Sequence, residues 1–145
     1  MKRINVATLL LAAICGCAFR APEPSYARDS SMPFAEARST LFKQAVTCWP
    51  RRPTPFRDGI SVSPNDPSPS EFEVKLYRWT AGGTLNRPFL VVILRQADKG
   101  TEVRVSEGDY SCNLAGTCKP LGLSQHVDRW LSADLSCPPI DTSSW

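Results

Sequence analysis

One histidine, His126, is the residue of this 145-residue chain best suited to acid–base chemistry. Its imidazole could act as general base for a serine with Asp128 as partner, or could pair with Cys112 or Cys118 as nucleophile. The chain lacks the G-x-S-x-G motif that would support the first arrangement. A lone imidazole without partners carries no mechanism, so we interpret His126 as a surface or boundary residue and keep a small hydrolase as an alternative.

Four cysteines lie beyond the N-terminal region: Cys48, Cys112, Cys118 and Cys137. Five residues separate Cys112 from Cys118, against the two to four of usual zinc pairs, so we expect neither a metal nor another cofactor. An even number of cysteines in a small exported domain indicates a disulfide framework, with three possible pairings. We favour Cys112–Cys118 across a short loop and Cys48–Cys137 across 88 residues. The long loop would contribute about 4 kcal/mol in the chain-entropy model.

A small basic cluster, Arg51, Arg52 and Arg57, is the weakest of the candidate sites. Guanidinium groups could contact anionic headgroups or lipopolysaccharide phosphates. Known polybasic membrane sites carry about 4 to 8 charges, so three solvated arginines are the simpler interpretation. The net charge of +3 includes two residues of the N-terminal leader, Lys2 and Arg3, and gives no case for nucleic acid as a partner.

The first seventeen residues indicate where the protein is targeted and not a catalytic function. Lys2 and Arg3 precede a mostly apolar segment that runs from Ile4 to Cys15. A membrane-spanning helix needs roughly 20 apolar residues, and this segment is too short. It fits the apolar region of a secretory signal peptide, which is about 7 to 15 residues long.

The sequence Ile14-Cys15-Gly16-Cys17 resembles the lipobox of bacterial lipoprotein precursors. The resemblance covers the leader only. It implies that residues 1–16 are a signal peptide and that Cys17 is acylated, which would anchor the protein in a membrane. Ala18 follows the cysteine; in Gram-negative lipoproteins the lack of Asp there implies the outer membrane, here with the domain facing the periplasm.

A second cleavage site competes with the first. Ser25-Tyr26-Ala27 has the small residues of an ordinary signal-peptidase site, and a cut after Ala27 would release a soluble periplasmic or secreted protein. With the lipobox cut, residues 17–31 comprise the lipidated cysteine and a flexible tether, because this stretch is polar and contains prolines. Residues 32–140 would then form a single globular domain, followed by a loose tail at 141–145.

Hydrophobic periodicity predicts the elements of that domain. Helices are expected over 33–48 and 124–135, each with an apolar stripe near the helical repeat. Strands are expected over 71–76, 89–94 and 101–107, with turns at 81–83 and 98–100 and a possible fourth strand at 110–112. The proline-rich stretch 50–70 should be loop, with a short strand at 60–62.

These elements predict an α+β fold: an antiparallel meander of three to four strands flanked by an N-terminal and a C-terminal helix packed on one face. The anchor, the tether and the disulfides favour a non-enzymatic cell-envelope lipoprotein, a small binding or structural module. Its partner would be an envelope protein, a glycan or a lipid. The main alternative is a secreted soluble carrier or inhibitor with a ligand on one sheet face, and the second is a hydrolase using His126.

Overall fold

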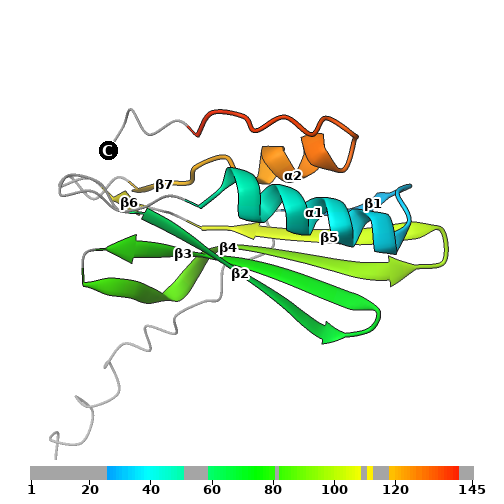
Figure 1. Cartoon of the computed structure of the whole chain (residues 1–145), viewed down its shortest axis with the longest axis horizontal. Helices are drawn as coiled ribbons and strands as arrows, with labels where there is room; N and C mark the ends of the chain where they lie inside the picture. Colours follow the sequence, from blue (N-terminus) through cyan, green and yellow to red (C-terminus); the bar gives the residue numbers. More distant parts are fainter. Residues whose placement is uncertain (1–25, 51–58, 81, 109–110, 113–117, 141–145) are drawn as a thin grey trace, which may run out of the picture.

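The computed structural model describes residues 26–50, 59–80, 82–108, 111–112 and 118–140. A five-stranded antiparallel sheet carries two helices on one side (Figure 1). In chain order the elements are β1 (Tyr26–Ser30), α1 (Phe34–Cys48), β2 (Gly59–Ser68), β3 (Glu71–Thr80), β4 (Gly83–Ala97), β5 (Gly100–Glu107), the two-stranded pair β6 (Ser111–Cys112) and β7 (Cys118–Lys119), and α2 (Ser124–Trp130). The strand order is β1-β5-β4-β3-β2, so β1 and β2 form the two edges.

The strands β2 to β5 form a meander, in which each strand pairs with the next along the chain. Its register aligns the apolar residues of one face: Val74 pairs with Val92, and Val92 pairs with Val105. All three side chains are fully buried. At the β4–β5 turn Gly100 has a φ of +116°, and a Cβ there would clash with the carbonyl oxygen of Ser30, so the position requires glycine.

Helix α1 connects the two edges of the sheet and therefore crosses its face. It begins after Pro33, which tolerates a helix start because its missing N–H would be unsatisfied there, and it ends before Pro50. Leu41 and Ala45 lie one turn apart and are fully buried, as is Trp49 just beyond the helix. The helix thus buries one stripe against the sheet.

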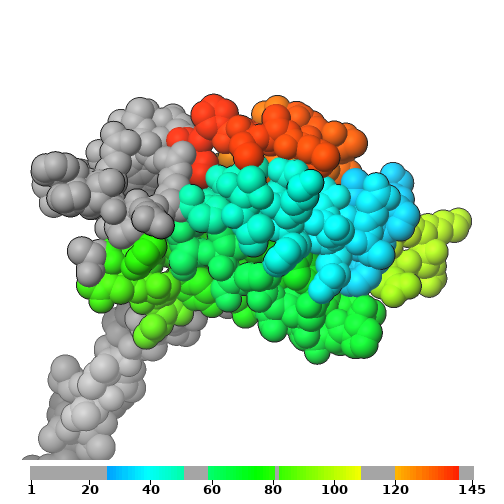
Figure 2. Space-filling model, in the orientation of Figure 1, coloured from blue at the N-terminus to red at the C-terminus, as the bar shows by residue number. Residues whose placement is uncertain are grey.

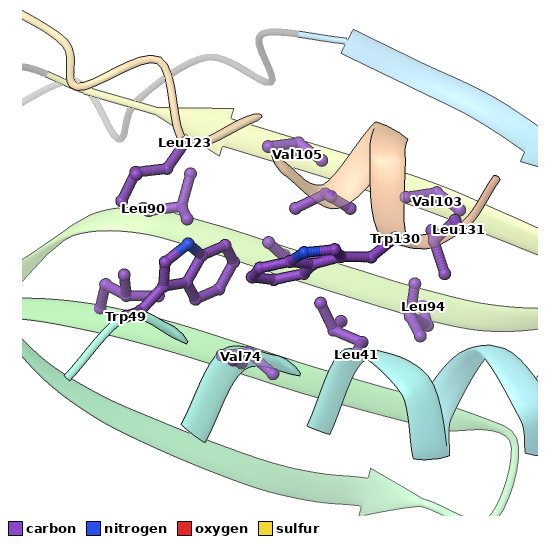
Figure 3. Close-up of a cluster of buried hydrophobic side chains, with 14 of the residues drawn as sticks. Leu41, Trp49, Val74, Leu90, Leu94, Val103, Val105, Leu123, Trp130 and Leu131 are labelled. Atoms are coloured by element: carbon purple, nitrogen blue, oxygen red, sulfur yellow. The ribbon is translucent and has the colours of Figure 1, made fainter. Parts of the chain in front are cut away.

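The core is completed by α2 and by the chain on either side of it. The indole rings of Trp49 and Trp130 lie side by side, with centroids 4.7 Å apart (Figure 3). Leu123 precedes α2, Leu131 follows it, and both are buried in the same cluster. Aromatic pairs at this separation add to the stabilisation from area burial, so the two tryptophans join the helices across the core.

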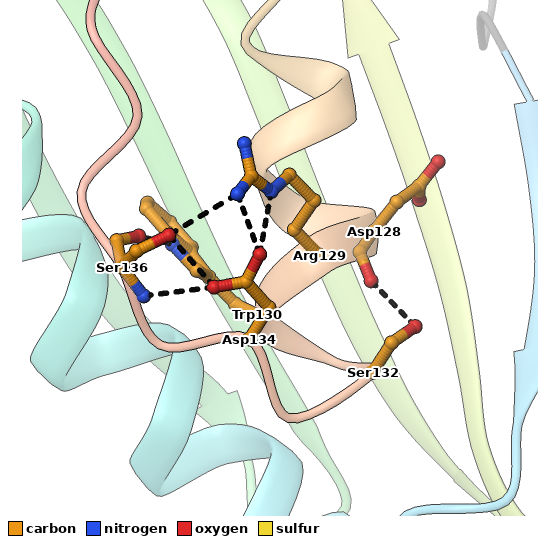
Figure 4. Close-up of polar contacts among 6 residues, drawn as sticks. All are labelled: Asp128, Arg129, Trp130, Ser132, Asp134 and Ser136. Carbon is orange, nitrogen blue, oxygen red and sulfur yellow. Dashed lines mark hydrogen bonds and ion pairs between the residues drawn. The ribbon is translucent and has the colours of Figure 1, made fainter.

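The chain turns back sharply after α2. Ala133 adopts a left-handed conformation with a φ of 67°. The guanidinium of Arg129 donates to the carboxylate of Asp134, and the Trp130 indole N–H donates to the carbonyl of Ser136 at 2.9 Å (Figure 4). Hydrogen bonds from Ser136 and Arg129 lower the pKa of Asp134 to about 2. The turn is therefore fixed by specific contacts.

The α+β architecture with an antiparallel sheet is confirmed, but two features of the prediction are wrong. The main sheet has five strands rather than three to four. The first helix does not open the domain, because β1 precedes it and pairs with β5 along the sheet edge. Residues 26–30 are thus a strand and not part of a flexible tether. They are polar, and their order comes from pairing with β5 rather than from local hydrophobicity.

Several element boundaries also need correction. The strand expected at 89–94 extends over Gly83–Ala97, and the strand expected at 71–76 continues to Thr80. The strand expected at 60–62 extends over Gly59–Ser68 in spite of Pro64 and Pro67. This strand is an edge strand, so the backbone N–H groups on its outer side have no partner strand and proline is tolerated at those positions. The second helix ends at Trp130 rather than at residue 135, because the chain turns at Ala133. The expected fourth strand at 110–112 is represented by β6, which pairs with β7 and not with the meander.

Candidate functional site

His126 lies in the first turn of α2 and is buried, with 7% of its surface exposed. Its Nδ1 accepts a hydrogen bond from the Trp49 indole N–H at 3.2 Å. The Trp130 ring contacts the imidazole edge-on, with centroids 5.9 Å apart. Because Nδ1 is an acceptor here, the neutral imidazole carries its proton on Nε2. His126 is therefore a buried hydrogen-bonding partner of the tryptophan core, and not the surface or boundary residue that the sequence indicated.

The electrostatic environment of His126 favours the neutral form. Burial lowers the pKa of the imidazole below its usual value, and the positive charge of Arg129 lowers it further. The carboxylate of Glu107 acts in the opposite direction with a smaller effect. The ring nitrogen that a general base would use, Nδ1, is already occupied by Trp49. A hydrolytic arrangement with Asp128 is not formed, since that carboxylate interacts with β1 instead.

One predicted disulfide is present close to this cluster. Cys48, the last residue of α1, is bonded to Cys137, which lies beyond α2. The bond joins two segments 89 residues apart in sequence. The predicted pairing Cys48–Cys137 is therefore confirmed.

A polar cluster that the sequence did not indicate joins β1 to α2. The Tyr26 hydroxyl donates to the carboxylate of Asp128 at 2.5 Å and lies 3.1 Å from the carbonyl oxygen of Ser124. Arg28, two residues further along β1, forms an ion pair with the same carboxylate at 2.9 Å. Burial and the Asp128 carboxylate raise the pKa of Tyr26 far above its usual value. Residues 26–28 are thus an integral part of the domain.

Glu107, at the end of β5, fixes the start of α2. One carboxylate oxygen accepts from the Leu123 backbone N–H at 2.9 Å, and the other accepts from the Ser124 N–H at 3.1 Å. These are backbone donors without partners inside the helix, so the distant carboxylate takes the place of a local capping side chain. Both carboxylates, Glu107 and Asp128, have structural partners here.

The sheet face opposite the helices carries polar and small apolar side chains. Cross-strand pairing places Glu71 opposite Arg95, and their charged groups are 2.6 Å apart. Val91 and Ile93 lie between such pairs and are half-buried. This mixture is typical of the solvated face of an antiparallel sheet.

A shallow depression lies where the start of α1 meets the β4–β5 turn. Its lining includes Pro33, Phe34, Gln96 and Ala97. The lining side chains are apolar, small or amide, and none of them is ionisable. The depression therefore offers no acid or base for catalysis.

Several predicted sites lie outside the described residues. These are the lipidation site Cys17, the signal peptide, and the basic cluster Arg51, Arg52 and Arg57. For Cys112 and Cys118 the backbone is described, and β6 and β7 place the two residues directly opposite one another. Their disulfide remains a prediction.

Within the described ranges, no group of three His, Cys, Asp or Glu side chains is arranged to hold a metal ion. Neither helix of the described part of the chain has the length and apolar character needed to cross a membrane. Comparison with models of protein families, with curated protein sequences and with solved structures gives no match.

Proposed function

We propose that this chain is a lipoprotein of a bacterial cell envelope, anchored through Cys17, whose domain acts as a small non-enzymatic binding or structural module. The proposal places it at the periplasmic face of the outer membrane. Its support is the lipobox at residues 14–17, together with the position at which the folded domain begins. The Cys48–Cys137 bond adds to this support, because stable disulfides form in oxidising compartments outside the cytosol.

The start of β1 is the single observation that carries the proposal. A cut before Cys17 leaves β1 whole and places eight residues, 18–25, between the anchor and Tyr26. A cut after Ala27 would remove the Tyr26 hydroxyl bonds to α2 and the first two backbone pairs with β5. Losing ordered edge contacts destabilises a small domain, so the architecture favours the lipoprotein site over the secretory one.

The surroundings of His126 support a non-enzymatic module. Its Nδ1 is engaged by a buried indole, and burial favours the neutral imidazole. The carboxylates nearest to α2 hold backbone donors, a tyrosine and an arginine. These interactions account for the polar groups that a hydrolase would have to use.

The test is cell fractionation with mass spectrometry of the intact protein. We expect the parent in the membrane fraction, with a mass increased by acyl chains, and the Cys17→Ser variant without acyl chains in the soluble fraction. Cys15→Ser is the matched control and should remain acylated, because the second lipobox position is variable. A mature chain that begins at Arg28, or an equal distribution of parent and Cys17→Ser between fractions, would refute the lipoprotein.

A further inference from the structure

The β3–β4 hairpin, described over residues 77–80 and 82–88, extends beyond the part of the sheet that the helices cover; we call these residues the hairpin end. Figure 2 shows it at the left edge of the molecule. Its turn is closed by Thr80, whose hydroxyl donates to the Gly83 carbonyl at 3.1 Å. Four successive residues, Thr84 to Arg87, are exposed. A strand covered on one face would bury alternate residues, so here both faces are open.

The hairpin end exposes large apolar side chains next to positive charge. Trp79 is 37% exposed and Leu85 is 45% exposed. Residues 77–88 also contain Arg78 and Arg87 and no acidic residue. Tryptophan prefers the interface between lipid and water, where its ring meets the apolar region and its N–H meets the headgroups. This composition suits a phospholipid surface better than a purely apolar groove.

The direction of β1 relates the hairpin end to the anchor. Tyr26 pairs with Val105 and Ser30 pairs with Thr101, so β1 runs away from the end of the sheet at which the hairpin projects. The polypeptide therefore enters the domain from the hairpin side. Residues 18–25 can bridge at most about 30 Å between Cys17 and β1. A lipid at Cys17 would keep the hairpin end close to the bilayer.

We infer that the hairpin end is a second membrane contact, in which Trp79 and Leu85 enter the headgroup region of the phospholipid leaflet that holds the Cys17 anchor. The inference rests on the proposed lipoprotein and adds an orientation to it. The β3–β4 end of the sheet faces the bilayer, and the opposite end, with the β2–β3 and β4–β5 turns, points into the periplasm.

The anchor makes a contact of this size effective. One tryptophan and one leucine bury too little apolar area to hold a soluble protein on a membrane, because interfacial binding scales with that area and with charge. Tethering converts the second contact into an intramolecular event at high effective concentration. The short link therefore allows a weak contact to fix the orientation of the domain.

Tryptophan fluorescence in vesicles tests the contact. The protein is extracted from membranes in the Trp145→Phe background, in which Trp79 is the one exposed tryptophan beside the buried Trp49 and Trp130. It is reconstituted into phosphatidylethanolamine vesicles with a minority of phosphatidylglycerol and of brominated phosphatidylcholine. Bromine quenches indoles that reach the lipid, so we expect quenching that disappears in Trp79→Phe.

Matched variants distinguish a hairpin end inserted into the lipid from random contact between the protein and the vesicles. Leu85→Ser should lose most of the quenching of Trp79, because it removes the second apolar side chain of the contact. Leu135→Ser should retain it, because Leu135 is more exposed, at 53%, but belongs to the segment after α2, which lies on the helix side of the sheet (Figure 1). Unquenched emission in the parent, or equal quenching in Leu85→Ser and Leu135→Ser, overturns the inference. Crosslinked dimers with unquenched Trp79 would assign the hairpin to a second copy and also overturn it.

The mass of the same sample distinguishes the two proposals. An acylated protein with unquenched Trp79 refutes the membrane contact and leaves the lipoprotein intact. A protein without acyl chains refutes the lipoprotein and, with it, the membrane contact, which is too small to hold an untethered domain on a membrane.

Discussion

At the scale of single residues, His126 shows how a candidate catalytic group becomes a structural one. The sequence identified it as the one imidazole of the chain, and no spacing pattern could show that Trp49 donates to its Nδ1. These residues lie 77 positions apart and meet only because α1 and α2 pack on the same core. The sequence indicated a surface or boundary position for His126, so both its burial and its partner depended on the tertiary fold.

The protonation of His126 should link stability to pH. The pKa of His126 is lowered in the folded state, so the unfolded chain binds a proton more readily than the folded chain. The free energy of unfolding therefore falls as the pH drops below about 6.5, by up to about 1.4 kcal/mol per pH unit. His126→Gln keeps an acceptor for Trp49 but does not titrate. We expect urea unfolding between about pH 5.5 and 7 to show a slope for the parent and a flat profile for His126→Gln.

The control is Gln125→Ala, an exposed neighbour on α2 that should keep the slope of the parent. His126 is the one histidine of the chain, which simplifies the assignment. A parent whose unfolding free energy is constant over this pH range would contradict the prediction.

Ala133 is a second residue whose role only the backbone reveals. A φ of 67° is unfavourable for a residue with a Cβ, and the turn after α2 imposes it. We expect Ala133→Gly to raise the free energy of unfolding by about 0.5 to 1 kcal/mol, measured by urea denaturation. Ala35→Gly, in the first turn of α1 at a conventional helical position, should give no such gain. Equal effects of the two substitutions would show that Ala133 carries no strain.

At the scale of elements, the sequence predicts an element correctly where the element's own residues carry the hydrophobic pattern that orders it. Helix α1 and strands β3 and β5 have strong periodicity, because each buries one face, and they were located correctly. Strand β1 has no such pattern: its ordering contacts come from β5 and from Asp128, about a hundred positions away. Local patterns cannot contain that information, so the strand was assigned to a tether.

The cluster of Tyr26, Arg28 and Asp128 should therefore control the stability of β1. Asp128→Asn removes the negative charge that accepts the hydrogen bond of Tyr26 and forms the ion pair with Arg28. We expect the free energy of unfolding to fall by about 1 kcal/mol. Buried hydrogen bonds to charged groups contribute somewhat more than this, but the Asp128 carboxylate is partly exposed. Amide hydrogen exchange should accelerate over residues 26–30 more than over β3.

The matched control breaks a different ion pair. Arg38→Gln removes the exposed contact between α1 and Asp66 on β2, and should leave the free energy of unfolding nearly unchanged, because water screens an exposed ion pair. Tyr26→Phe should reproduce the local exchange effect of Asp128→Asn. Unchanged protection of β1 in both variants would mean that backbone pairing with β5 holds the strand without α2.

At the scale of the whole molecule, three connections hold the ends of the folded region to its middle. Strand β1 is joined to α2 through Asp128, the start of α2 is fixed to β5 by Glu107, and Cys137 is bonded to the end of α1. Each of the two helices is thus attached by a contact that is distant in sequence. The sequence anticipated the disulfide, because cysteine is recognisable wherever it lies, but not the two carboxylates, which resemble any surface acid.

The Cys48–Cys137 bond should be the strongest of these connections. Its loop spans 89 positions, so the Cys48→Ala/Cys137→Ala protein should lose about 2 to 4 kcal/mol of unfolding free energy, measured by urea denaturation with tryptophan fluorescence. The comparison is Cys112→Ala/Cys118→Ala, which removes the predicted Cys112–Cys118 bond; its much shorter loop gives roughly half the entropic effect in the same model. Adding reductant should destabilise the second variant, which keeps the long-loop bond, about twice as much as the first. Equal stability of the oxidised parent and Cys48→Ala/Cys137→Ala would show that the five-stranded sheet, the tryptophan pair and the two carboxylates suffice to hold α1 against the segment after α2.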